Sequence, residues 1–186
     1  MTCSRYAESD SGRIKVVTSA TRPTGASRYV GQRIYETDTG RELLYDGSGW
    51  IIMYEPAQAW TPTFTGITGG TPTTTGYFQR SNGHIDIWAR LTFGGAPSAI
   101  SSLGVTLPYQ AYSMGNNQLQ VAFGDTGSQV YPGTHDSSTT GPILYAINAS
   151  AATANLVTVS ASVPFSFGAT DTVHVTGRYM LANRYV

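Results

Sequence analysis

The sequence predicts an all-β protein, with an N-terminal extended arm, a small three-stranded β-meander and then a β-sandwich or jelly-roll-like domain. Short runs of strand length recur along the chain, separated by turn-forming Gly, Pro, Asn and Ser. No window of about a dozen residues keeps a helical apolar spacing without interruption by Gly, Pro or a β-branched residue. The dipeptide Asn82-Gly83, between two such runs, is typical of a type I′ hairpin.

Residues 1–28 are expected to form the arm. They are polar apart from one apolar patch at residues 14–17, and Arg-Pro-Thr-Gly at residues 22–25 favours a turn. A terminal segment of this kind frays unless something holds it. We therefore expect neighbouring chains to clamp it.

Residues 29–58 are expected to form the β-meander, a docking module. Its strand-like runs lie at residues 32–36, 41–45 and 50–54. The two turns between them contain glycines, which adopt positive φ readily, and the aspartates Asp38 and Asp46, whose carboxylates can bond the backbone across the turn. A meander this small buries little apolar surface alone, which favours packing around a three-fold axis as a homotrimer.

Residues 59–186 are expected to form the β-sandwich domain. Its candidate strands are residues 60–65, 76–80, 84–93, 104–107, 118–123, 143–147, 156–159 and 172–181. In the third of these, Ile, Ala and Leu alternate with polar or larger residues, which predicts one apolar face. Trp88 belongs to the other face, so we expect it to point toward a second core layer or a partner.

Charge is scarce in this protein, which narrows the function classes. Charged residues make up 12% of the chain, against about a quarter in typical domains, and the formal net charge is zero. No basic stripe is available to neutralise phosphates, so nucleic acid is not an expected partner. A surface so poor in charge is easier to explain if much of it is buried in an assembly.

The sequence also bears on compartment and membrane association. Cys3 is the single cysteine, so no intrachain disulfide is expected. Charged residues interrupt residues 1–20, and a run of about eighteen apolar residues occurs nowhere. We expect synthesis in the cytosol, with no signal peptide and no membrane contact.

Part of the chain resembles a known class of proteins. Residues 19–50, which include YVGQRIYETDTGRELLYDGSGW, resemble a short module in virion proteins of tailed bacteriophages, particularly minor tail or fibre-like proteins of phages that infect actinobacteria. The segments AWTPTFTGIT, TTTGYFQRSNGHIDIWARLTFG and VPFSFGATDTVHVTGRY are similar to the β-rich domain that often follows this module. The resemblance covers roughly residues 19–180 and includes no catalytic signature. It implies a structural role in a virion without choosing between head and tail.

These observations favour a non-enzymatic structural protein on the surface of a tailed-phage virion, assembled in the bacterial host cytoplasm. We expect a homotrimeric minor tail or fibre-like protein, which its N-terminal arm anchors to other virion structural proteins. The sandwich is expected to face outward and to contact a host-surface glycan. The alternative is a capsid decoration protein that ornaments or stabilises the head. No cofactor is expected in either case.

Two Asp-Thr-Gly triplets, at Asp38 and Asp125, raise a remote alternative, an aspartic-type protease. Two carboxylates that share one proton can activate water. Such an enzyme needs a similar lobe around each aspartate, whereas one triplet here joins two runs of the meander and the other lies in an unrelated stretch. Asp-Thr-Gly is also ordinary hairpin chemistry, so turns are the favoured interpretation and no catalytic residue is assigned.

Ligand recognition by loops is a further candidate activity. Tyr109, Tyr112, Tyr131 and His135 lie in stretches rich in Gly, Pro and Asn, and aromatic rings beside amides and hydroxyls are a usual means of stacking on sugars or docking onto proteins. The competing interpretation is that these tyrosines pack under their own loops or at a subunit interface. The three histidines are far apart and lack ligand spacing, so no metal site is expected.

Overall fold

The computed structural model of the protein describes residues 13–113, 119–136, 138–148 and 155–185. Its elements, in chain order, are β1 (Lys15–Val17), η1 (Ser19–Thr21), η2 (Gly25–Ser27), β2 (Arg33–Glu36), β3 (Arg41–Tyr45), β4 (Trp50–Tyr54), β5 (Gln58–Trp60), β6 (Phe64–Gly69), β7 (Thr73–Ser81), β8 (His84–Thr92), β9 (Pro97–Val105), β10 (Leu119–Gly124), β11 (Val130–His135), β12 (Leu144–Asn148), β13 (Asn155–Thr158) and β14 (Thr172–Met180). Apart from the two 3-10 turns η1 and η2, every element in the described ranges is a strand. The all-β prediction is therefore confirmed.

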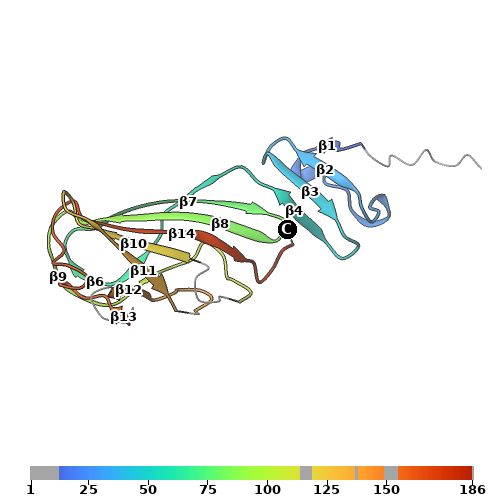
Figure 1. Ribbon diagram of the computed structural model, residues 1–186. Coiled ribbons are helices and arrows are strands. Elements are labelled where there is room, and N and C mark those ends of the chain that lie inside the picture. The colour runs from blue at the N-terminus through green and yellow to red at the C-terminus, as the bar shows by residue number, and fades with distance from the viewer. Residues whose placement is uncertain (1–12, 114–118, 137, 149–154, 186) are drawn as a thin grey trace, which may run out of the picture.

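The strands form two domains placed end to end. The first sheet has the order β1-β2-β3-β4, and the large sheet has the order β13-β12-β11-β10-β14-β8-β7-β5. In Figure 1 the first sheet lies at one end of an elongated molecule, while β7, β8 and β14 run along the larger domain away from the junction. The C-terminus lies close to that junction (Figure 1).

The predicted meander is present with nearly the predicted bounds. Strands β2, β3 and β4 pair in antiparallel register, and Gly40 and Gly47 in the two turns have φ of 67° and 102°. The Asp46 carboxylate accepts hydrogen bonds from the backbone N–H groups of Ser48 and Gly49, at 2.9 and 3.0 Å. This is the turn chemistry that the sequence predicts for Asp46.

The expected arm needs a correction in its described part. β1 pairs with β2 in parallel register, and Val17 packs against the apolar core of the first sheet. The Asp38 carboxylate accepts two hydrogen bonds from Ser19, from its N–H at 2.9 Å and its hydroxyl at 2.5 Å. Residues 13–28 therefore belong to the first domain instead of extending away from it, while residues 1–12, which include Cys3, lie outside the described residues.

A buried ion pair explains why this segment folds back. The carboxylate of Glu36 is fully buried, and Arg22 Nε lies 2.6 Å from its Oε1. The hydroxyl of Thr39 donates to the other carboxylate oxygen at 2.9 Å. Burying a carboxylate without such partners would cost free energy of folding. The segment that carries Arg22 must therefore lie against the first sheet, where Arg22 can reach Glu36.

The large domain is a sandwich in which one layer is much wider than the other. The two-stranded ribbon of β6 and β9 covers the inner face of the eight-stranded sheet, and apolar side chains of β8, β9, β10, β12 and β14 form one core. In β8, Ile85, Ile87, Ala89 and Leu91 are buried, whereas Trp88 lies on the opposite face. This alternation is the predicted one.

The hairpin of β7 and β8 turns at Asn82-Gly83, as predicted. Both residues have positive φ, 48° and 76°, which is the conformation of a type I′ turn.

One strand of the large sheet was not expected. β11 carries Tyr131 and His135, which the sequence analysis placed in loops, because Pro132 and Gly133 are typical of turns. Pairing with β12 begins only at Gly133, so β11 can tolerate a proline at the preceding position. A Cβ at Gly133 would lie 2.5 Å from the ring of Phe123, so close packing requires a glycine there.

The pair of Arg22 and Glu36 gives a test of the corrected arm. Glu36→Ala is expected to lower the free energy of unfolding by about 3 kcal/mol, at the lower end for a buried ion pair because Arg22 is partly exposed. The matched control is Glu42→Ala, which removes an exposed pair with Arg33 and should cost less than about 1 kcal/mol. Urea unfolding followed by circular dichroism measures both. Equal small losses would contradict a structural role for residues 13–28.

Candidate functional site

The two domains meet at a carboxylate held between two arginines. Glu55 follows β4 and its side chain is only 1% exposed. Arg41 of the first sheet reaches one carboxylate oxygen at 2.6 Å, and Arg80 of β7 reaches the other at 2.6 Å. Burial alone would raise the pKa of Glu55, but the hydrogen bonds from Arg80 and Arg41 outweigh it and hold the pKa below its ordinary value.

Backbone hydrogen bonds extend this interdomain joint on both sides of Glu55. The N–H of Asn82 donates to the carbonyl of Ile52 at 2.8 Å, and the N–H of Glu55 donates to the carbonyl of Arg80 at 3.1 Å. Near the end of the chain, Arg184 lies 3.0 Å from the carboxylate of Asp46. A Cβ at Gly49 would lie 2.6 Å from the ring of Tyr185, so the C-terminal segment packs directly on the first domain.

Tyr109, a predicted ligand residue, is part of the packing behind this joint. Its ring meets Phe78 edge to face at 5.4 Å between centroids, and the Arg80 guanidinium lies 4.7 Å from its centroid. The hydroxyl of Tyr179 donates to the Tyr109 carbonyl at 2.9 Å, and burial raises the pKa of that hydroxyl. Tyr109 therefore takes part in the packing behind the joint, while its side chain remains 39% exposed.

Tyr112 lies apart from the other predicted residues. Its side chain is 71% exposed, and its backbone N–H donates to the carbonyl of Met180 at 2.8 Å. With His84 and residues 180–185, it lines a hollow of about 320 Å³ beside the C-terminal segment. Tyr112 therefore remains available for contact with another molecule.

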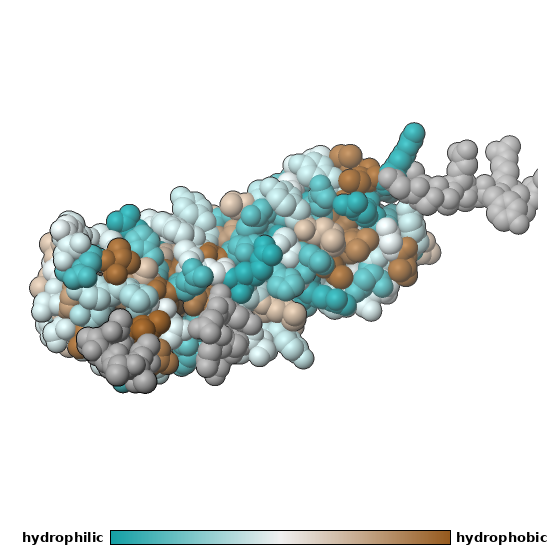
Figure 2. All heavy atoms as spheres, in the orientation of Figure 1, coloured by the Kyte–Doolittle hydropathy of each residue, from teal (hydrophilic) through white to brown (hydrophobic). Residues whose placement is uncertain are grey.

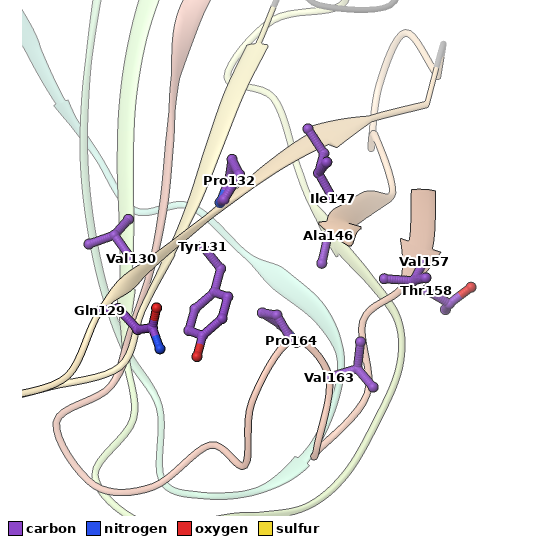
Figure 3. Close-up of a pocket in the computed structure, with 10 residues that line it drawn as sticks. All are labelled: Gln129, Val130, Tyr131, Pro132, Ala146, Ile147, Val157, Thr158, Val163 and Pro164. Carbon is purple, nitrogen blue, oxygen red and sulfur yellow. The ribbon is translucent and has the colours of Figure 1, made fainter. Parts of the chain in front are cut away.

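Tyr131 lines a cavity of about 630 Å³. The cavity lies between β11 to β13 and the loop that contains Pro164, and Figure 3 shows Tyr131 and Pro164 extending into the same space. The Tyr131 ring stacks on Phe165 at 5.1 Å between centroids. Its ten lining residues include no acidic, basic or histidine side chain, so this cavity suits an apolar or flat uncharged group and offers no acid or base.

His135 does not belong to that cavity. Its side chain is buried, and its Nε2 accepts a hydrogen bond from the N–H of Leu119 at 3.1 Å. Its Nδ1 contacts the carbonyl of Asp136, to which it donates. Both ring nitrogens are therefore engaged inside the protein, and His135 has no free group for a ligand. The structure does not bring the four predicted residues together into one site.

The two Asp-Thr-Gly triplets lie in turns of different sheets. Asp38 joins β2 to β3, and hydrogen bonds from Ser19 lower the pKa of its carboxyl. Asp125 follows β10, and its backbone N–H and carbonyl close the turn to β11 through Gln129 and Ser128. An aspartic dyad needs two adjacent carboxylates that share a proton, and these turns do not form that arrangement.

The described residues contain neither a cluster of metal ligands nor a membrane-spanning helix. No three His, Cys, Asp or Glu side chains gather there as a metal site would require. None of the helices in the same ranges has the length and apolar character needed to cross a membrane.

The geometry defines an all-β protein of two domains coupled by a buried ionic joint. Comparison with protein-family models, with curated proteins and with solved structures found no match.

The joint residues were not among those predicted from the sequence. Glu55 was placed in the docking module of residues 29–58, after its last strand-like run, and was given no role, although one signal was present. Arg80 shares the inward-facing side of β7 with Phe78, and an arginine at an inward position indicates a buried partner. The partner lies 25 residues away, so the sequence alone does not name it.

The joint predicts a specific dependence on pH. Because the folded-state pKa of Glu55 is lowered, its stabilising contribution is present above about pH 4.5 and is lost as the pH falls through the lower folded-state pKa. Glu55→Gln is expected to cost about 3 kcal/mol of unfolding free energy at pH 7 and to reduce the loss of stability in acid. Urea unfolding from pH 7 to pH 3 measures this, with Glu42→Gln as control. An unchanged acid profile in Glu55→Gln would contradict the assignment.

Proposed function

We propose that this protein is a structural component of a tailed-phage virion, most simply a minor tail or fibre-like protein. The first domain attaches it to other virion structural proteins, and the large domain is displayed outward to contact the host surface. The observation that supports this best is the distribution of exposed apolar side chains between the two domains.

Half of the large hydrophobic residues that are exposed in the described ranges lie on the small first domain. They are Ile14, Val16, Tyr29, Val30, Tyr35 and Tyr54. Register places Val16 beside Tyr35, and Tyr35 and Tyr54 both pair with Glu42, so three of them share the outer face of the first sheet. Exposed apolar side chains gathered in this way are typical of surfaces that are covered in an assembly.

The large domain lacks a comparable cluster on the view of Figure 2. There, hydrophobic residues form small separate patches among hydrophilic and neutral ones. The face of the large domain in this view fits exposure to solvent, whereas the outer face of the first sheet fits burial. The joint at Glu55 would fix the orientation of the large domain relative to the first domain. A protein that is anchored by one domain and displays the other requires such a fixed orientation.

The homotrimer is part of this proposal. The outer face of the first sheet is self-complementary in composition, with Val16, Tyr35 and Tyr54 beside the exposed pair of Arg33 and Glu42. Three copies packed around an axis would cover these side chains and the edge strand β1.

Variants on the outer face of the first sheet test whether this face anchors the protein in assembling particles. The double variant Val16→Ser with Tyr35→Ser is expected to remain folded and to lose incorporation into particles, because it removes apolar contact without touching the core. The matched control is Leu156→Ser, which removes a side chain of similar exposure, 60% against 65% for Val16, from the large domain. Quantitative mass spectrometry of purified particles measures incorporation, and light scattering measures the oligomer. Normal incorporation of the double variant would contradict this anchoring surface.

Labelling of intact particles distinguishes the tail role from the capsid decoration role. Antibody-labelled electron microscopy is expected to show the protein at the tail. A dense distribution over the head would instead support the capsid decoration role.

A further inference from the structure

The outer face of the large sheet carries a strip of aromatic side chains across three neighbouring strands. Tyr77 of β7 and Trp88 of β8 are register partners, with ring centroids 5.9 Å apart and planes tilted by 37°. Trp88 also meets His174 of β14, at 6.2 Å between centroids. Tyr77 is 53% exposed, so the strip is open to solvent. None of the three side chains contributes to the core behind the sheet.

A shallow hollow adjoins the strip at His174. Its volume is about 260 Å³, and it extends from β14 over β10 to β11. Gln120, Ala122, Pro132 and Thr176 line it together with His174. The floor therefore combines apolar groups with an amide and a hydroxyl, which can bond the hydroxyls of a sugar while the neighbouring rings stack on its C–H face.

A cation without an ion-pair partner stands beside the same strip. Arg90 is exposed and pairs in register with His174 on one side and Thr75 on the other. Among the described residues no carboxylate lies within ion-pair distance of Arg90, whereas Arg178 on the same face is bound by Asp86 at 2.7 Å. Burial and then the charge of Arg90 lower the pKa of His174, which favours the neutral form of this histidine.

We propose that this strip and hollow bind an acidic polysaccharide, with the rings of Tyr77 and Trp88 stacked on sugar rings and Arg90 paired to a sugar carboxylate. Charge complementarity favours this occupant, because a sugar carboxylate can form an ion pair with Arg90 that a neutral glycan cannot, and an apolar protein surface would have to bury the charge of Arg90. A planar carboxylate matches the two parallel donors of the guanidinium. The proposal rests on the proposed outward display of the large domain and names the chemistry that this domain would contact.

Titration of the purified protein with an oligogalacturonate, which carries one carboxylate on each sugar, tests the proposal. Calorimetry is expected to detect binding, and the fully methyl-esterified oligomer, which keeps the shape and loses the charge, should bind at least about tenfold more weakly. Arg90→Gln and Tyr77→Ala should each reduce affinity for the acidic oligomer by a similar factor. The control is the double variant Asp86→Asn with Arg178→Gln, which removes the neighbouring arginine of the same face without leaving Asp86 unpaired and should leave affinity nearly unchanged.

Each of the following results would overturn the proposal. They are no binding of the oligogalacturonate, equal binding of its ester, and an equal loss in the double variant Asp86→Asn with Arg178→Gln. The proposal would also be overturned if the wild-type protein self-associates and Arg90→Gln abolishes this self-association, because a second copy of the protein would then cover the face. Because these measurements use purified protein, they remain separate from incorporation into particles, and failure of one proposal does not imply failure of the other.

Discussion

The buried carboxylate of Glu55 is the constraint on which the arrangement of the two domains depends. Removing a carboxylate from water is unfavourable unless its charge is paired and its oxygens are hydrogen-bonded. Here the partners come from opposite sides of the junction, Arg41 from the first sheet and Arg80 from the large one. Neither domain alone supplies both arginines. The carboxylate is therefore fully compensated only when the domains sit end to end.

Other features follow from that arrangement. Arg80 is itself almost buried, and the ring of Tyr109 lies against its guanidinium, so this tyrosine contributes to the packing around the joint. The C-terminal segment reaches back so that Arg184 pairs with Asp46 in a turn of the first domain. A surface that attaches the first domain would thus also orient the large domain and the aromatic strip on its outer face. This coupling is the physical basis for the proposed division into anchor and display.

The features that could be predicted from the sequence are those that a few neighbouring residues determine. The strands of the meander and the hairpin at Asn82-Gly83 were recognisable because glycine turns and alternation are encoded within a few residues. β11 was missed because Pro132 and Gly133 mimic a turn, and only the approach of Phe123 explains the glycine. The four candidate ligand residues lie in stretches of similar composition, but the fold does not bring them to one place. His135 is buried, and Tyr109 packs behind the joint. Long-range pairs such as Glu55 with Arg80 depend on tertiary contacts that no local pattern encodes.

Residual dipolar couplings of backbone amides test the rigid joint most directly. In the wild-type protein, a single alignment tensor should fit amides of both domains in their present relative orientation. In Glu55→Gln, each domain should retain its own fold while the two require different tensors, because an uncharged side chain no longer holds Arg41 and Arg80 together. Two different tensors in the wild-type protein would contradict the account.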